Sequence, residues 1–294
     1  MSKELDNEKA FFKKAVILMI FCGLTGSMIF VCAKAGGDIS PIQKLFFQNL
    51  IVVLFGLPIM IKNGYWYQKG KKVFKPLLLR CIFGVLAATI SFYCLQRMLV
   101  SDVNMLLQIS PIFTAVFAVF MLKEKFPKSN WLFYSIALFG CVLIIKPGTD
   151  TVLLLPALLC ILCAIISSVD LNLLRIIGKR GMVGLPVIFY FGLFSLLVSF
   201  PWVIFNFAPM NSLQFLSILG IGVFTLLTQT FLSYAYTMAP SARISIYSYA
   251  GILFCGVNGF IFFKEIPDKI SLIGYALIIF TALALYLRDN KDKS

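Results

Sequence analysis

Few side chains in this 294-residue chain could carry out covalent chemistry. The sequence holds no histidine, and it has neither a G-x-S-x-G nucleophile motif nor a P-loop. Cys160 and Cys163 have the spacing of a metal-binding pair, but no second pair accompanies them, and a structural zinc site needs four ligands. All eight cysteines lie within apolar runs, where they behave as small hydrophobic residues. We therefore expect no enzyme activity, no bound metal and no cofactor.

Asp170 is the only carboxylate well inside a long apolar run, about four residues before that run ends. A charged group in lipid is costly unless it is paired or hydrated, so such residues often carry function in membrane proteins. We expect Asp170 to accept a proton or to bind a cation. The alternative is an ion pair with Arg175 or Arg243 at the inner face of a membrane.

Three further charged residues could control access to a site. Arg80 lies one turn into its apolar run, where it could contact a substrate or extend its guanidinium to the lipid headgroups. Arg243 and Asp102 open two runs that hold equivalent positions in the repeat described below. We expect these two charges to act as alternating gates, Arg243 on the inner side and Asp102 on the outer side. Anchoring at the membrane interface is the alternative.

Uncharged polar side chains form stripes that could line a cavity. Asn104 and Gln108 are four residues apart and share one helix face, and Pro111 frees a backbone carbonyl one turn before it. A second polar group occupies Thr228–Tyr234. Hydrogen bonds between helices are the alternative explanation of such stripes. The residues that we expect to bind a substrate are Asn104, Gln108, Gln229, Tyr234, Ser245 and Tyr249.

Long apolar runs surround these polar residues and decide the class of protein. Hydrophobic residues make up 60% of the chain and charged residues 13%, with a mean hydropathy of +0.95. Soluble domains carry roughly 25% charged residues. A helix needs about 20 mostly apolar residues to cross a bilayer. Such runs predict ten transmembrane helices, at Ala15–Ala33, Ile42–Ile61, Leu77–Gln96, Val103–Leu122, Asn130–Ile145, Val152–Leu174, Val183–Phe205, Leu213–Thr237, Ala242–Phe263 and Ile270–Leu287.

The placement of basic residues orients these helices. The formal net charge is +14. With the N-terminus inside, twenty of the 26 lysines and arginines fall in inner segments, which is the positive-inside pattern. Nucleic-acid binding would instead gather basic residues and stacking aromatics on one exposed face. We therefore expect a multi-pass protein of the inner (cytoplasmic) membrane with both termini in the cytoplasm, and no nucleic-acid partner.

The sequence repeats itself. A constant shift along the chain aligns the second half with the first without a gap. The shift places Lys123-Glu124 on Lys264-Glu265, two pairs that we expect to act as structural caps or loop pairs at helix ends. Five helices per repeat is an odd number, so the second copy must enter the membrane from the opposite side. Inverted repeats are a common plan of secondary transporters, in which the site lies near the midplane between the copies.

The fold class that follows is an all-α integral membrane protein with ten transmembrane helices, arranged as two inverted five-helix repeats. We divide the chain into a cytoplasmic N-terminal tail (1–14), a first repeat (15–146), a second repeat (152–287) and a cytoplasmic C-terminal tail (288–294).

Nearly the whole chain resembles the EamA-type members of the drug/metabolite transporter superfamily. The resemblance rests on the ten-helix, two-repeat plan, on Ile109–Phe113 (ISPIF) with Glu124 thirteen residues after the proline, and on the echo Phe262–Lys269 (FFKEIPDK). Many relatives have an arginine in the second helix where this chain has Gln48, and Ile252 stands where the first repeat has its proline. The resemblance implies a carrier of small metabolites or drugs that in most cases works without ATP.

These features predict a secondary transporter that uses alternating access, either proton-coupled or an exchanger, to move a small metabolite or drug-like solute. A non-transporting membrane scaffold or receptor is the main alternative, and a channel would show faster, non-saturating flux. A membrane-embedded enzyme is a further alternative, but it would need a cluster of acids, histidines or a nucleophile near one interface. The expected partners are membrane lipids and the solute, and the chain would act as a monomer or homodimer.

Overall fold

The computed structural model describes residues 2–64, 73–107, 109–123, 130–145, 154–240, 244, 247–248, 250–266 and 268–291. Throughout this part of the chain the backbone forms helices joined by turns, and no strand. The helices are α1 (Ser2–Ala35), α2 (Pro41–Asn63), α3 (Phe74–Leu95), α4 (Val100–Leu107), α5 (Ser110–Leu122), α6 (Asn130–Ile145), α7 (Leu154–Lys179), α8 (Leu185–Asn206), α9 (Ser212–Met238), α11 (Ala250–Phe263) and α12 (Lys269–Lys291).

Several stretches of described helix are long and apolar enough to cross a membrane. There are seven, at Phe11–Ala35, Pro41–Asn63, Phe74–Leu95, Asp102–Leu122, Leu154–Lys179, Leu185–Asn206 and Ser212–Met238. Shorter apolar helices lie at Leu253–Phe263 and Lys269–Thr281. Large apolar side chains such as Phe120, Phe205 and Ile266 are mostly exposed. A surface of this kind suits lipid rather than water, and the chain is an all-helical, multi-pass membrane protein.

The fourth run, predicted as one helix over Val103–Leu122, holds the described helices α4 and α5, and Gln108 between them lies outside the described residues. Ile109 keeps a helical backbone, with φ −69° and ψ −22°, and Pro111 stands in the first turn of α5. A proline has no backbone N–H, and its ring clashes with the carbonyl one turn earlier. The Ile112 amide donates instead to the Ile109 carbonyl at 2.9 Å, a tighter turn than the α-helix makes. The helix therefore tightens locally around Pro111, in the same run as Asn104.

Three other expected boundaries differ from the helices observed. The predicted tail, residues 2–14, continues as the first turns of α1. The run expected to end at Leu174 continues to Lys179 in α7, which moves Asp170 further from the helix end. The ninth run, Ala242–Phe263, is described as continuous helix only from Ala250, in α11.

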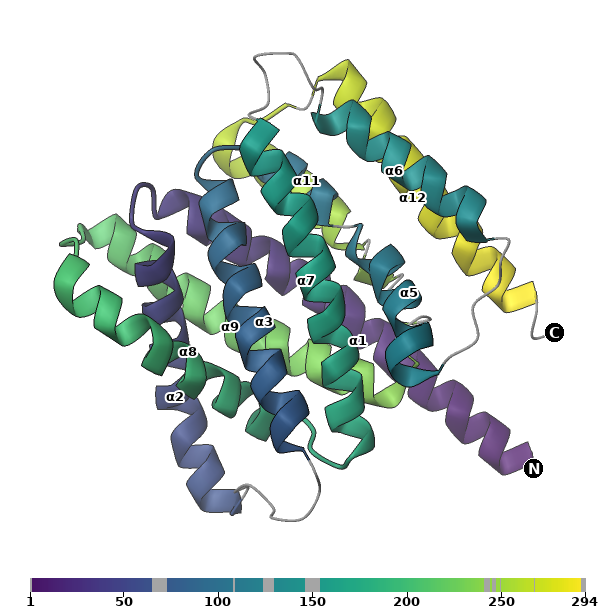
Figure 1. Ribbon diagram of the computed structural model, residues 1–294, viewed down its shortest axis with the longest axis horizontal. Coiled ribbons are helices and arrows are strands. Elements are labelled where there is room, and N and C mark those ends of the chain that lie inside the picture. The colour runs from purple at the N-terminus through teal and green to yellow at the C-terminus, as the bar shows by residue number, and fades with distance from the viewer. Residues whose placement is uncertain are drawn as a thin grey trace.

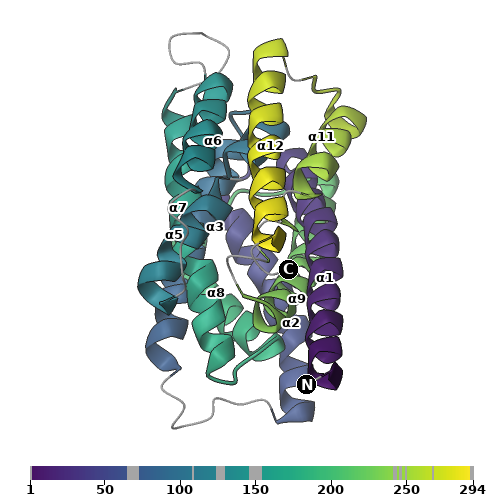
Figure 2. The same cartoon turned by 90° about the vertical axis from the view of Figure 1, so that its right-hand side faces the viewer.

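Helices from the two halves of the sequence pack on each other. α1 contacts α9 and α11, while α7 contacts α3 and α5. α6 and α12 lie side by side at one edge of the bundle, and α2 packs against α8 (Figures 1 and 2). The sequence repeat relates α1 to α7, α3 to α9 and α5 to α11 by position. The first helix of each half, α1 or α7, therefore packs against equivalent helices of the other half.

The ends of α5 and α11 share an unusual backbone. Lys123 and Lys264 have φ angles of 56° and 57°, in the left-handed region that residues other than glycine seldom adopt. These two lysines occupy equivalent positions in the sequence repeat. Among the residues described, no other non-glycine residue has a positive φ. The two halves therefore terminate equivalent helices with the same left-handed turn.

Candidate functional site

A buried arginine meets a carboxylate and an amide among α3, α7, α8 and α9. The Arg80 side chain is 1% exposed, and its Nη2 donates to Gln229 Oε1 at 3.2 Å. Its Nε lies 3.9 Å from Asp170 Oδ1, and its Cζ lies 5.3 Å from the centre of the Phe191 ring. We refer to Arg80, Asp170, Phe191 and Gln229 as the Arg80 cluster. It joins α3 of the first half to three helices of the second.

The hydrogen bonds of the Arg80 cluster are incomplete. Nε and Nη1 of Arg80 and Oδ1 of Asp170 are buried, and none has a hydrogen-bond partner in the described part of the chain. Leaving a buried donor or acceptor without a partner costs about 1–3 kcal/mol, and more for a charged group. A cluster that serves only stability would be expected to satisfy these atoms, because an imperfectly bonded buried ion pair contributes little. The free donors and acceptor are instead available to a ligand.

Phe191 and Gly84 fix the position of the guanidinium. Gly84 follows Arg80 by one turn on α3, and a Cβ added to it would lie 2.5 Å from Phe191 Cε2. The missing side chain therefore lets the Phe191 ring approach α3 and cover the Arg80 guanidinium, a cation–π contact. Sequence reasoning did not find Phe191, because it is one of 30 phenylalanines and carries no distinguishing pattern.

The structure corrects two statements about these charges. Arg80 does not extend to the headgroups, since its side chain is buried against Gln229 and Phe191. Asp170 lies nine residues before the end of α7, about 14 Å at 1.5 Å per residue, not four residues from the end. Its described ion-pair partner is Arg80 rather than Arg175.

Arg175 takes a different position. Its Nη1 donates to the carbonyls of Tyr236 and Thr237, at 2.9 and 3.3 Å. These are among the last carbonyls of α9, where a cation also interacts favourably with the helix dipole. Arg175 therefore holds α7 against the end of α9.

Polar side chains of α7 also bond to α5. Ser168 Oγ donates to the Ser110 carbonyl at 2.9 Å, and Asn172 Nδ2 donates to the Thr114 carbonyl at 3.0 Å. These contacts attach α7 to the first turns of α5 through hydrogen bonds between helices.

The predicted substrate-binding residues lie in different places. Gln229 belongs to the Arg80 cluster. Asn104 is buried on α4, and its Nδ2 has no hydrogen-bond partner among the residues described. Tyr234 is 42% exposed and packs against Gly184, where an added Cβ would lie 2.9 Å from its hydroxyl oxygen. The structure thus places Tyr234 at the turn between α7 and α8 and not among the contacts of the Arg80 cluster.

Four of the predicted site residues lie outside the described part of the chain. They are Gln108, Arg243, Ser245 and Tyr249.

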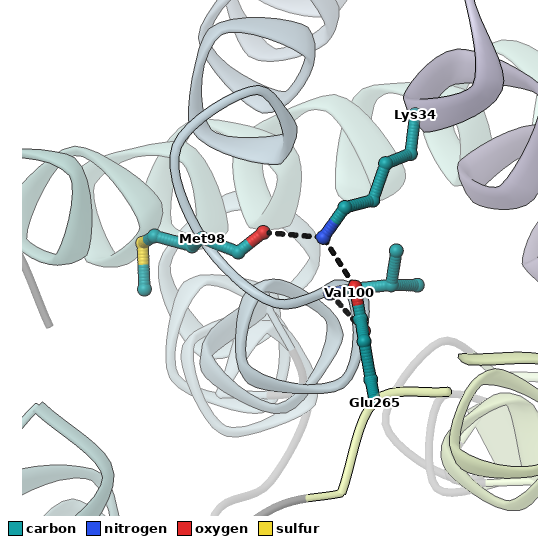
Figure 3. A network of polar contacts seen from close by, with 4 residues as sticks. All are labelled: Lys34, Met98, Val100 and Glu265. Atoms are coloured by element: carbon teal, nitrogen blue, oxygen red, sulfur yellow. Dashed lines mark hydrogen bonds and ion pairs between the residues drawn. The ribbon is translucent and has the colours of Figure 1, made fainter. Parts of the chain in front are cut away.

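A second ion pair ties together several segments at another end of the bundle. Lys34 Nζ, in the last turn of α1, donates to the Glu265 carboxylate and to the Met98 carbonyl, the latter at 3.2 Å. Glu265 Oε2 accepts from the Val100 amide at 2.9 Å (Figure 3). We call Lys34, Met98, Val100 and Glu265 the Lys34 network. Its cation lies at the C-terminus of α1 and its carboxylate at the N-terminus of α4, as the helix dipoles favour.

Asp102 lies close in sequence to the Lys34 network. Its carboxylate is buried and accepts a hydrogen bond from the Tyr275 hydroxyl at 2.8 Å, which joins α4 to α12. At this end of the bundle the described ion pair between the halves is made by Lys34 and Glu265. Glu265 caps α4 rather than its own helix, a use of the Lys264-Glu265 pair that sequence spacing did not indicate.

Comparison with known proteins gives the chain relatives along most of its length. Residues 13–146 match the EamA-like transporter family. The pseudopaline exporter CntI of Pseudomonas aeruginosa is 26% identical over 275 residues, which cover 93% of this chain and 96% of the exporter. The S-adenosylmethionine uptake transporter of Rickettsia prowazekii is 24% identical, with 85% and 83% covered. Human solute carrier family 35 member G1 is 25% identical, with 92% and 78% covered.

A solved crystal structure shares the fold. It aligns with a TM-score of 0.70 over 96% of this chain and 99% of its own, at 17% sequence identity. The relatives are an exporter, an uptake transporter and a solute carrier rather than enzymes.

Proposed function

Because residues 13–146 match the EamA-like transporter family and the relatives along most of the chain are transporters, we propose that this chain is an EamA-type member of the drug/metabolite transporter superfamily and a secondary transporter working by alternating access. It moves a small metabolite or drug-like solute across the cytoplasmic membrane. The observation that carries this proposal is the Arg80 cluster. Charged groups are rare within membrane-spanning helices, and those that persist mark substrate or ion pathways. Here an arginine of one half lies close to an aspartate of the other, and three of their polar atoms have no hydrogen-bond partner among the described residues.

We also propose that the chain consists of ten spanning segments in two inverted repeats, residues 15–146 and 152–287. The support is threefold. The sequence aligns with itself at one constant shift, the left-handed turns at Lys123 and Lys264 obey the same shift, and so does the packing of α1 and α7 on the opposite half. In such carriers the site lies between the copies.

The substrate would bind between the Arg80 cluster and α4. In this proposal Arg80 and Asp170 hold its polar groups, and Asn104 supplies a further donor from α4. The other residues proposed to line the cavity are Gln108, Gln229, Tyr234, Ser245 and Tyr249.

Asp170 is also the proposed proton acceptor, and facilitated exchange without a coupling ion is the close alternative. Transport measured across mildly acidic to mildly alkaline pH separates the two. Proton coupling requires that Asp170→Asn removes the pH dependence of the flux. If the variant transports with the wild-type pH profile, Asp170 is not the proton carrier.

Gates at the two ends of the cavity complete the cycle. The Lys34 network joins α1, α4 and the end of α11, and opening this end requires its ion pair to part. Asp102 lies in the first turn of α4 beside it and bonds to Tyr275, so we place Asp102 in the same outer gate. Arg243 is proposed for the inner gate.

The proposed orientation has both termini in the cytoplasm, on the basis of the positive-inside pattern. Reporter fusions to each terminus test it. A reporter that is active only in the cytoplasm should work at both ends, and activity at one end alone would require an odd number of spans.

Counterflow in proteoliposomes tests the proposed function. The purified chain is reconstituted in vesicles loaded with unlabelled compounds from a metabolite panel, and uptake of labelled counterparts is followed. A carrier gives saturable, substrate-specific exchange. Absence of flux for every compound would favour a scaffold or receptor, and rapid non-saturating flux would indicate a channel.

A further inference from the structure

We propose that the transported solute is net neutral and carries one anionic and one cationic group, bound to Arg80 and Asp170 respectively. This inference rests on the proposed transport function and adds the chemical class of the solute. The chemistry that the site recognises is that of a zwitterion, with a carboxylate or similar anion and an ammonium a few bonds apart.

The unused hydrogen-bonding atoms carry the first part of the argument. Arg80 keeps two buried donors, Nε and Nη1, without a partner among the described residues, while Gln229 occupies Nη2. Asp170 keeps Oδ1 as a buried acceptor. Nε and Oδ1 are 3.9 Å apart, beyond hydrogen-bonding distance, so the two charges face each other without satisfying each other. An anion can take the free donors, and an ammonium can donate to the free carboxylate oxygen.

Charge balance decides which solute fits. With Asp170 ionised, the charges of Arg80 and Asp170 sum to zero, so the two residues give the site no net charge. A solute with a single charge would pair with one residue and leave the other buried without a partner, which is unfavourable in a low-dielectric site. A zwitterion forms two ion pairs at once and keeps the whole site neutral. The site therefore favours zwitterions over anions and cations of the same size.

The charged cluster is present in only one copy. The repeat places Ile221 at the position of Arg80, Ile29 at that of Asp170 and Ala88 at that of Gln229. The repeat-equivalent positions are thus apolar, and among the two copies the charged pair is specific to Arg80 and Asp170.

Matched derivatives of one carbon skeleton test the class directly. The probes are the protein amino acids and betaines, the same amino acids with the amine acetylated, and the same amino acids with the carboxylate amidated. Binding is measured on the full-length chain in detergent as the ligand-induced shift in thermal unfolding. Counterflow in proteoliposomes then shows which binders are transported. A zwitterion should bind at least tenfold more tightly than either of its blocked derivatives.

A neutral double variant, Arg80→Gln with Asp170→Asn, keeps the site free of net charge and so avoids the buried lone charge of either single variant. It should bind the zwitterion and its two derivatives within threefold of one another. The proposal is overturned if the wild type binds a blocked derivative as tightly as the zwitterion, or if the double variant keeps the tenfold preference.

Failure of the inference and failure of the proposed function give different results. If counterflow finds transported solutes and all are singly charged, the solute class is wrong while the chain remains a transporter. If no compound of any charge is transported, the proposed function itself fails, and the solute class with it.

Discussion

The chain has two described ion pairs between its halves, and they differ in how completely they are bonded. In the Lys34 network the ammonium contacts the Glu265 carboxylate and the Met98 carbonyl, and the carboxylate also accepts the Val100 amide. In the Arg80 cluster the charges stand 3.9 Å apart, and three of their polar atoms lack a partner among the described residues.

This difference separates a contact that holds helices together from a contact that can hold a solute. The Lys34 network lies at helix ends, where the dipoles of α1 and α4 support its two charges. The Arg80 cluster lies within the spans of α3, α7 and α9, where the same dipoles are remote and the burial cost is larger. A ligand can repay that cost, which is why the incomplete pair is the better candidate site.

Breaking the Arg80 cluster should produce the largest effect. Arg80→Ala leaves Asp170 as a buried charge without its partner, and removal of one member of a buried pair costs about 3–5 kcal/mol. We expect a marked fall in thermal stability and transport reduced by roughly 100-fold, about 2.7 kcal/mol at 1.36 kcal/mol per tenfold. Thermal unfolding in detergent and counterflow flux measure the two effects. Wild-type flux in Arg80→Ala would remove the cluster from the mechanism.

Breaking the Lys34 network should have a smaller effect on stability and a distinct effect on rate. Glu265→Gln keeps an acceptor for the Val100 amide but loses the ion pair with Lys34, so we expect about 1–2 kcal/mol of lost stability. The transport rate should change several-fold with little change in substrate affinity, because the outer end opens more easily. Thermal unfolding and the concentration dependence of counterflow measure these effects.

Two further variants sharpen that result. Lys264→Gln is the matched control, since Lys264 is the adjacent exposed lysine and contacts only the Phe260 ring among the interactions described. Exchange of the charges, Lys34→Glu with Glu265→Lys, should fail to restore stability, because it puts each charge at the wrong end of a helix dipole. Full recovery in this double variant would show that the dipoles do not matter here.

Gly84→Ala tests the positioning of the guanidinium by Phe191. The added methyl would lie 2.5 Å from Phe191 Cε2, so the ring has to move away from α3. Overpacking of this kind costs roughly 1–3 kcal/mol, and we expect weaker substrate binding as the guanidinium loses its cover. Gly256→Ala on α11 is the control, because an added Cβ there meets nothing within 4 Å. Equal substrate affinity and thermal stability of the two variants would count against the role of Phe191.

Replacing Lys123 and Lys264, whose backbone is in the left-handed region, should have the smallest effect on stability. Lys123→Gly and Lys264→Gly remove the cost of a side chain in the left-handed region, so each should raise stability by about 1 kcal/mol. Lys14→Gly, inside α1, should lower stability by a similar amount. Thermal unfolding compares the three. Opposite signs at Lys123 and Lys264 would show that the two halves do not end their helices alike.

Sequence patterns were sufficient for an all-helical membrane protein and for part of the site. Seven of the ten expected spans correspond to described helices long and apolar enough to cross a membrane. Runs of about 20 apolar residues identify spans because lipid leaves few other solutions for the backbone. Arg80, Asp170 and Gln229 stood out because polar groups are rare in such runs. Their meeting could not be predicted, since it depends on how α3, α7 and α9 pack.

Other features left no signal in a single sequence. Phe191 differs from the other phenylalanines only in its neighbours, and the use of Glu265 as a cap for α4 joins residues 165 positions apart. The depth of Asp170 was underestimated because apolar composition falls before α7 ends, while its helix continues through Arg175 to Lys179. Periodicity reports which residues can share a face, and only packing shows which of them touch.

The central claim is that the incompletely bonded pair is the transport site. Its most direct test is counterflow by the Arg80→Gln/Asp170→Asn double variant, reconstituted beside the wild type and matched to it in thermal stability. The wild type should show saturable counterflow, and the double variant should lose at least tenfold of that flux. Equal flux from the two proteins would contradict the account and place the transport site elsewhere in the chain.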